Sequence, residues 1–127
     1  MAEFSFDLLK VIAESQSTSG KLSKNVIFSP SSVFRALLIL YLGSNGNTKA
    51  QLNSALHLRG ITEEEGKYKS WKKQSVPGVL EADRLYHDSD VKVKSAIKSL
   101  LGEDLEKVSM RGDSTVTKVN KWVSDLT

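Results

Sequence analysis

The apolar residues at the start of the chain recur at the spacing of one helix face. This spacing predicts an amphipathic helix over residues 4–15, followed by a loop rich in Ser, Thr, Gly and Lys. The short run Asn25–Phe28 combines β-branched and aromatic side chains, which favours a strand, and Pro30 ends it because proline lacks an amide N–H. The apolar residues of the first helix face are Phe4, Leu8, Val11 and Ile12.

A denser apolar segment comes next. Residues 33–42 are apolar except for Arg35, a pattern that predicts a helix buried on nearly all sides, with Ser32 placed to cap its first turn. A turn with two glycines follows, and then Thr48 and Gln51 form a capping-box pattern. The helix expected there presents one apolar face, made by Leu52, Ala55 and Leu56.

The second half of the chain alternates between helical and strand patterns. The predicted elements are helices over 59–74 and 91–101 and strands over 79–87 and 105–110. Asp113 or Ser114 then caps a last helix, whose apolar stripe is Val116, Val119, Val123 and Leu126. The pattern therefore predicts an α+β fold in one domain, with about six helices and two or three strands of an incomplete mixed sheet.

Composition narrows the functional classes. A hydrophobic fraction of 39% with 26% charged residues is typical of a globular chain rather than a disordered one. The absence of cysteine excludes disulfides, thiolate metal sites and cysteine nucleophiles, and it fits a reducing compartment. A net charge of only +3 without a dense basic block disfavours nucleic acid. No run reaches the roughly 18 apolar residues of a membrane span, and no cofactor motif is present.

Several blocks of this sequence resemble the N-terminal signature of the serpins, the serine-protease-inhibitor superfamily. Asn25–Ser32 reads NVIFSPSS, and after the apolar helix Tyr41–Leu52 reads YLGSNGNTKAQL. Ala82–Tyr86 is similar to the family's A-N-x-L-F strand, with Asp83 in place of the asparagine. Asn120–Val123 together with Thr127 is similar to its N-x-W-V-x-x-x-T helix.

The resemblance implies a mixed α/β protein whose large sheet opens to admit a cleaved reactive loop, which traps the protease as a distorted covalent complex. Only the front of a serpin is matched, so residues 1–127 are expected to be the N-terminal portion of a single serpin domain. The reactive loop is not among them, and the chain is not expected to inhibit alone. The implied partners are a complementary serpin C-terminal polypeptide and, through the complete inhibitor, a serine protease.

Two sets of residues gain candidate roles from the resemblance. Ser29 and Ser32 match the two serines of the family's shutter, where short hydroxyl side chains can exchange hydrogen-bond partners as strands part; the alternative is that Ser32 only caps the helix. In several serpins the helix corresponding to 59–74 binds heparin. Lys69, Lys72 and Lys73 are therefore candidates for polyanion (glycosaminoglycan) binding, against the alternative of a solvated helix diluted by neighbouring glutamates.

No arrangement in the sequence indicates catalysis or a metal. His57 stands without a carboxylate or cysteine at ligand spacing and is interpreted as a surface residue. Glu81 and Asp83 share a strand face, but no histidine joins them, and a metal site needs a convergent set of ligands. The sequence also has no nucleophile–base pair and no glycine-rich phosphate loop, so an enzyme is disfavoured.

Two functional hypotheses remain. The first is the N-terminal part of a serpin-type inhibitor that needs the C-terminal portion carrying the reactive loop. The alternative is a short non-inhibitory serpin-like protein that acts as an interaction module through unpaired strand edges. The start MAEFSFD has an early acidic residue and no apolar core of signal-peptide length. A cytoplasmic protein is therefore expected, with a secreted mature form given a new methionine as the alternative.

Overall fold

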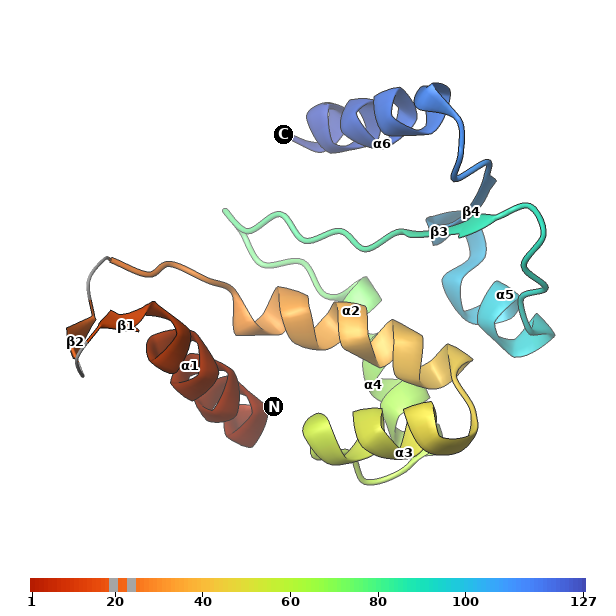
Figure 1. Cartoon of the computed structure of the whole chain (residues 1–127). Helices are drawn as coiled ribbons and strands as arrows, with labels where there is room; N and C mark the ends of the chain where they lie inside the picture. Colours follow the sequence, from red (N-terminus) through yellow and green to blue (C-terminus); the bar gives the residue numbers. More distant parts are fainter. Residues whose placement is uncertain (19–20, 23–24) are drawn as a thin grey trace. The chain divides into compact units, whose positions relative to one another are not determined.

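The structure is a computed structural model that describes residues 1–18, 21–22 and 25–127. It divides into two compact units, Met1–Tyr68 and Lys69–Thr127, each of which is considered by itself. The described part of the chain contains six α-helices, a short 3₁₀ helix and two two-stranded sheets (Figure 1). The prediction of an α+β fold is therefore confirmed.

The first unit is built from helices. Its elements are α1 (Ala2–Gln16), β1 (Ser17–Thr18), β2 (Lys21–Leu22), α2 (Pro30–Gly43), α3 (Gly46–Ala55) and the first part of α4 (Ile61–Lys73). Both α1 and α3 contact α2. Phe4 of α1 meets Phe34 of α2 edge to face with ring centroids 5.4 Å apart, a geometry that aromatic pairs prefer. The buried apolar residues of this unit are Phe4, Phe34, Leu38, Ile39, Tyr41, Leu42, Leu56 and Tyr68.

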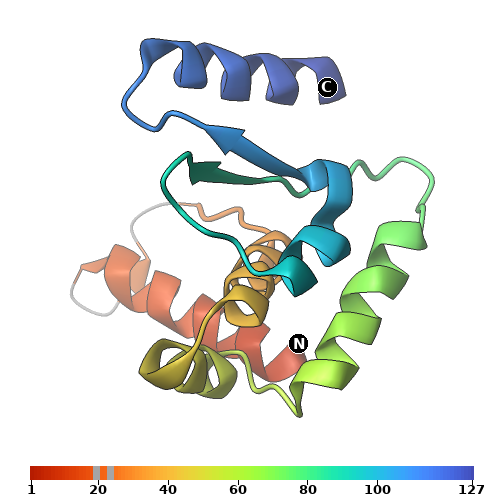
Figure 2. The ribbon, with the colours of Figure 1, turned by 90° about the vertical axis from the view of Figure 1, so that its right-hand side faces the viewer.

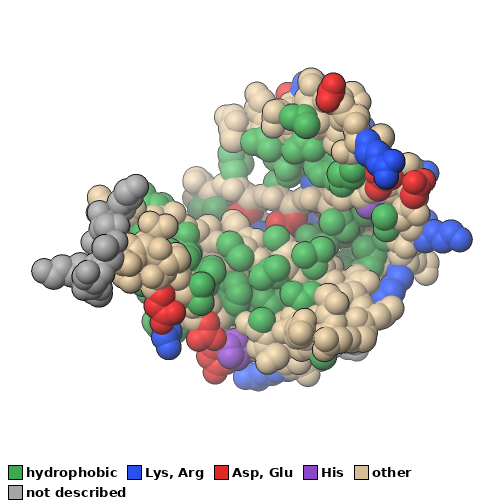
Figure 3. Space-filling model, in the orientation of Figure 1, with side chains coloured by type: hydrophobic (Ala, Val, Ile, Leu, Met, Phe, Trp, Pro, Cys, Tyr) green, Lys and Arg blue, Asp and Glu red, His purple; other side chains and the backbone are tan. Residues whose placement is uncertain are grey.

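α2 differs from the prediction of a helix buried on nearly all sides. Val33 and Leu40 are 39% and 51% exposed, and Figure 3 shows green hydrophobic side chains across the visible surface of this helix. Arg35, the one charged residue of the segment, is buried. The apolar pattern indicates that this helix needs cover on nearly all sides, and the described residues supply only part of that cover.

The predicted strand Asn25–Phe28 is not a strand in the structure. No described residue pairs with it, and Ile27 is 99% exposed. A strand depends on hydrogen bonds from a neighbouring chain segment, so β-branched composition alone cannot establish it. The capping box at Thr48 was also wrong, because α3 begins earlier, at Gly46, with Asn45 in the N-cap position and no side-chain cap.

The second unit contains a parallel pair of strands with a helix on either side. Its elements are β3 (Leu85–Asp88), α5 (Ser95–Leu101), η1 (Gly102–Asp104), β4 (Leu105–Val108) and α6 (Asp113–Leu126). Figure 2 shows α6 on one side of the β3–β4 pair and α5 on the other. In the register Tyr86 is opposite Glu106, and His87 is opposite Lys107. Because side chains alternate along a strand, these two pairs of residues lie on opposite faces.

The two strands and the last helix were predicted in the correct places, although β3 is shorter than the predicted strand over 79–87. Gly102 ends α5 with a φ of +54°, in agreement with the predicted helix end. The cap of α6 was predicted wrongly. The N-cap is Gly112, and the preceding turn is closed instead by Thr115 Oγ1, which donates a 2.6 Å hydrogen bond to the carbonyl oxygen of Ser109.

Candidate functional site

Ser29 and Ser32 meet at the start of α2. Ser29 is the N-cap residue, and the backbone N–H of Ser32 donates a hydrogen bond of 3.3 Å to Ser29 Oγ. Pro30 occupies the first helical position, where its missing N–H is not needed. The alternative that Ser32 caps the helix was therefore wrong: Ser29 is the cap, and Ser32 contributes its backbone. Both side chains are exposed, so neither hydroxyl is held in a closed core.

Replacing Ser29 with alanine is expected to lower the free energy of unfolding by about 1 kcal/mol, the usual loss when a capping hydroxyl is removed. Ser32→Ala is expected to cost clearly less, because only the backbone of Ser32 takes part in the capping bond. Urea unfolding followed by circular dichroism at 222 nm measures both variants. Equal losses for the two serines would contradict the assignment of Ser29 as the cap.

The three candidate polyanion-binding lysines lie near the end of α4 and differ in their surroundings. Lys72 Nζ pairs with Asp104, and its distance to the carbonyl oxygen of Leu101 is 3.5 Å. Among the described residues, Lys69 and Lys73 have no ion-pair partner, and both are exposed. Only two of the three lysines therefore present an unpaired charge, and the carboxylate beside Lys72 opposes anion binding at that point.

A buried carboxylate lies in the same helix. Glu64 has a side chain that is only 1% exposed, and Lys67 Nζ lies 2.9 Å from its Oε1. The same ammonium group lies 2.9 Å from Oε1 of the exposed Glu63. The hydrogen bonds that Lys67 donates to Glu64 and then to Glu63 raise the pKa of Lys67, and the bond to Glu63 lowers the pKa of that carboxyl group. The sequence pattern does not distinguish Glu64 from the adjacent glutamates, whereas in the structure it is buried together with Tyr68, one turn later in the same helix.

The strand pair is joined to α6 through Trp122. Tyr86 of β3 meets this indole edge to face with centroids 6.5 Å apart, and the guanidinium carbon of Arg84 lies 5.1 Å from its centre. Arg84 and Tyr86 are two residues apart and contact the same indole ring, so they lie on one face of this extended segment. Glu106 of β4 lies on the same face, 3.1 Å from Arg84 Nη1, and it also pairs with Lys118 of α6.

Two carboxylates of the strand pair have lowered pKa values. The hydrogen bond from Lys118 is the main cause for Glu106, with further contributions from the charges of Lys118 and Arg84. For Asp88 the main cause is the backbone N–H of Met110, which donates a 2.9 Å hydrogen bond to Oδ2. These carboxylates therefore have structural partners, and neither is placed as an acid or base of a catalytic site.

His57 is exposed, in agreement with the surface residue that the sequence indicated, but it has carboxylate partners that the sequence did not reveal. Its Nε2 lies 2.8 Å from Asp7 Oδ2, and its Nδ1 lies 3.5 Å from Glu3 Oε2, both on α1. His57 also adopts a φ of +53°, as the left-handed residue that ends α3. The carboxylates come from a distant part of the chain, so local spacing could not reveal them.

Among the described residues, no group of three or more His, Asp or Glu side chains could hold a metal ion. In the same part of the chain, no helix is long and apolar enough to cross a membrane.

The family assignment predicted from the sequence blocks is confirmed by comparison. The family model described as Serpin (serine protease inhibitor) matches residues 1–127, so the chain belongs to the serpin family.

Individual relatives show how similar the chain is to other serpins and how much of their length it covers. The chain is 27% identical to serine protease inhibitor 88Ea of Drosophila melanogaster, over 98% of this chain and 31% of that protein. It is 29% identical to leukocyte elastase inhibitor of Xenopus tropicalis, over 98% of this chain and 35% of that protein. It is 26% identical to the human leukocyte elastase inhibitor, over 98% of this chain and 34% of that protein. The chain therefore spans about a third of the length of these relatives.

Proposed function

We propose that this chain is the N-terminal part of a serpin-type serine protease inhibitor, which inhibits only together with a C-terminal polypeptide carrying the reactive loop. Family membership and the one-third coverage of the relatives support the proposal. The chain would then contribute scaffold rather than chemistry, and it would not act as an enzyme. Its first partner would be the complementary serpin polypeptide, and a serine protease would be engaged through the assembled inhibitor.

The exposed apolar surface at α2 is the observation that carries this proposal. Val33 and Leu40 of α2 and the preceding Ile27 are exposed, although an apolar helix is stable only when its faces are covered. Asn25–Phe28 has the composition of a strand but no strand partner among the described residues. A complementary polypeptide that supplies a neighbouring strand and an apolar cover would satisfy both requirements at once.

Within the assembled inhibitor, Ser29 and Ser32 would form part of the shutter. Their exposed hydroxyls at the start of α2 are free of the tight packing that would oppose a change of hydrogen-bond partner. Polyanion binding at α4 would rest mainly on Lys69 and Lys73, because Lys72 is paired with Asp104. The cysteine-free composition fits a cytoplasmic site of action better than a secreted one.

The first test is intact-mass spectrometry of the purified native material after denaturation. A second serpin polypeptide that accompanies this chain would support the proposal, and a panel of serine proteases would then be scored for complexes that survive SDS. The assembled material is expected to form such a complex, and the isolated chain is not. A single species at the mass of this chain would favour the alternative, and an SDS-stable complex formed by the chain alone would overturn the proposal.

The alternative is a short, non-inhibitory serpin-like protein that acts as an interaction module. The observation in its favour is the apolar stripe of α6, where Val116 is 64% exposed and Val123 is 48% exposed. Such a stripe can associate with a second chain. Sedimentation analysis distinguishes the two cases, because the module is expected to self-associate or bind a partner without affecting any protease.

A further inference from the structure

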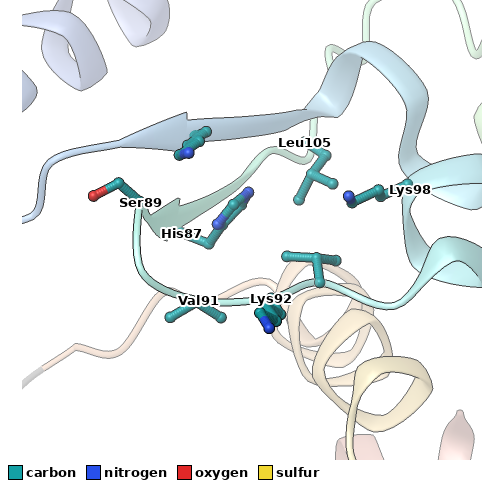
Figure 4. A pocket seen from close by; sticks show the side chains of 8 residues that line it. His87, Ser89, Val91, Lys92, Lys98 and Leu105 are labelled. Carbon is teal, nitrogen blue, oxygen red and sulfur yellow. The ribbon is translucent and has the colours of Figure 1, made fainter.

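A hollow of about 550 Å³ lies in the second unit, on the face of the strand pair opposite Trp122. Its walls come from β3, β4, α5 and the segment that connects β3 to α5. Figure 4 shows His87, Leu105 and Lys98 reaching toward this space from three different elements, with Lys92 on its lower side. The volume is within the range of ligand-binding pockets.

The charges around the hollow have one sign. Lys92, Lys98 and Lys107 line it, and no lining residue, all of them in the described part of the chain, carries a carboxylate. None of these three lysines has an ion-pair partner among the described residues. Three ammonium groups around one hollow repel one another, and a bound anion would remove that repulsion.

None of the acidic residues nearby in the sequence lines the hollow, and two of them pair with cations elsewhere. Asp104 pairs with Lys72, and Glu106 pairs with Arg84 and Lys118 on the opposite strand face. Asp88 accepts hydrogen bonds from the backbone N–H groups of Met110 and Asp90. The lining of the hollow therefore holds three lysines and no carboxylate.

The remaining lining residues define the kind of anion. Ser89 offers a hydroxyl, while Val91, Val93 and Leu105 give apolar walls that can contact a carbon skeleton. His87 Nδ1 lies 2.9 Å from the carbonyl oxygen of Asp88. A carbonyl oxygen can only accept a hydrogen bond, so this ring nitrogen is the donor. A lysine ammonium group binds phosphate as a point charge, and several such groups around one space can each contact a different oxygen of a tetrahedral oxyanion.

We infer that this hollow binds a small organic molecule carrying two or more phosphate or sulfate groups. The groups would lie between Lys98 of α5 and Lys107 of β4, with Lys92 closing the site. This site is distinct from Lys69 and Lys73 on α4, and it does not depend on the proposed inhibitory function.

The test is isothermal titration calorimetry at physiological salt with two probes, inositol hexakisphosphate and a trisulfated disaccharide. The variant Lys98→Gln with Lys107→Gln is compared with the charge-matched control Lys69→Gln with Lys73→Gln. The first is expected to weaken binding at least about tenfold, because it removes two charge-assisted hydrogen bonds. The control is expected to change binding less than about threefold, since Lys69 and Lys73 do not line the hollow and salt screens exposed charges.

The outcomes separate the sources of the anion. Binding of the phosphate probe alone would identify phosphorylated ligands, and binding of the sulfate probe alone would identify sulfated ones; either supports the site. Equal weakening by both variants would show non-specific charge attraction and would overturn the inference. So would a larger loss in the α4 control, or no binding of either probe.

A second measurement on the unmodified chain protects the test against a misfolded variant. Lysine acetylation is followed by peptide mass spectrometry with and without the bound probe. Lys92, Lys98 and Lys107 are expected to be protected, and Lys69 and Lys73 are expected to react as before. Uniform protection, or protection confined to α4, would count against the hollow.

Discussion

Replacing Lys67 with methionine is expected to lower the free energy of unfolding by about 3 kcal/mol. The substitution leaves the Glu64 carboxylate, whose side chain is 1% exposed, without its cation. No described residue hydrogen-bonds to its Oε2. Breaking a buried ion pair from one side typically costs about 3–5 kcal/mol. The lower end applies here, because the Lys67 side chain is 42% exposed and solvent screens part of the interaction.

Urea unfolding followed by circular dichroism measures this loss, and the chain offers a matched control. Glu63 contacts the same ammonium group at 2.9 Å but is 49% exposed, so Glu63→Gln is expected to cost less than about 0.5 kcal/mol. Adding Glu64→Gln to Lys67→Met is expected to recover much of the stability, because the double variant no longer buries a charge. Equal losses for Lys67→Met and Glu63→Gln would show that the pair acts as a surface ion pair.

The pH dependence of this variant has a definite sign. The carboxylates of Glu64 and Glu63 raise the pKa of Lys67 above its ordinary value of 10.5. Its stabilisation is therefore fully present below that ordinary value and is lost as the pH rises through the higher pKa of the folded state. The stability difference between the native chain and Lys67→Met is thus expected to stay constant from neutral pH up to about pH 10 and to shrink only above it.

Elements specified by local pattern could be predicted from the sequence, whereas long-range cover could not. The spacing of apolar residues predicts α1 and α6, and a short apolar run between turns predicts β4. Val33 and Leu40 have the same hydrophobicity as the buried positions of α2, and the sequence does not tell which side is covered. The serpin resemblance predicted the family, but it did not reveal which side of α2 is covered.

The charged residues were less predictable, because their partners lie far away in the sequence. Lys72 reads as one of three exposed lysines, but a carboxylate from η1 neutralises it. His57 gains its carboxylates from α1. The cationic hollow was equally unpredictable. β3, α5 and β4 each contribute one lysine or histidine to its lining, and no one of these residues indicates a site by itself.

Replacing Trp122 with alanine is expected to release α6 from the strand pair at a cost of about 2 kcal/mol. Trp122 is half-buried, and no residue of α6 is fully buried in the structure. The substitution removes the edge-to-face contact with Tyr86 and the stacking of Arg84, worth roughly 0.5–1.5 and 0.5–1 kcal/mol beyond the buried area. The ion pair between Lys118 and Glu106 remains, but a partly exposed pair contributes little.

Hydrogen exchange of the backbone amides measures this release, because a helix held by few contacts opens locally before the whole unit unfolds. In Trp122→Ala the amides of α6 are expected to exchange roughly 30-fold faster, the factor equivalent to about 2 kcal/mol. The control is Val123→Ala on the exposed stripe, for which little change is expected. If Val123→Ala accelerates exchange as strongly, the stripe is already covered in solution. That result would favour association of α6 with another chain over anchoring by Trp122 alone.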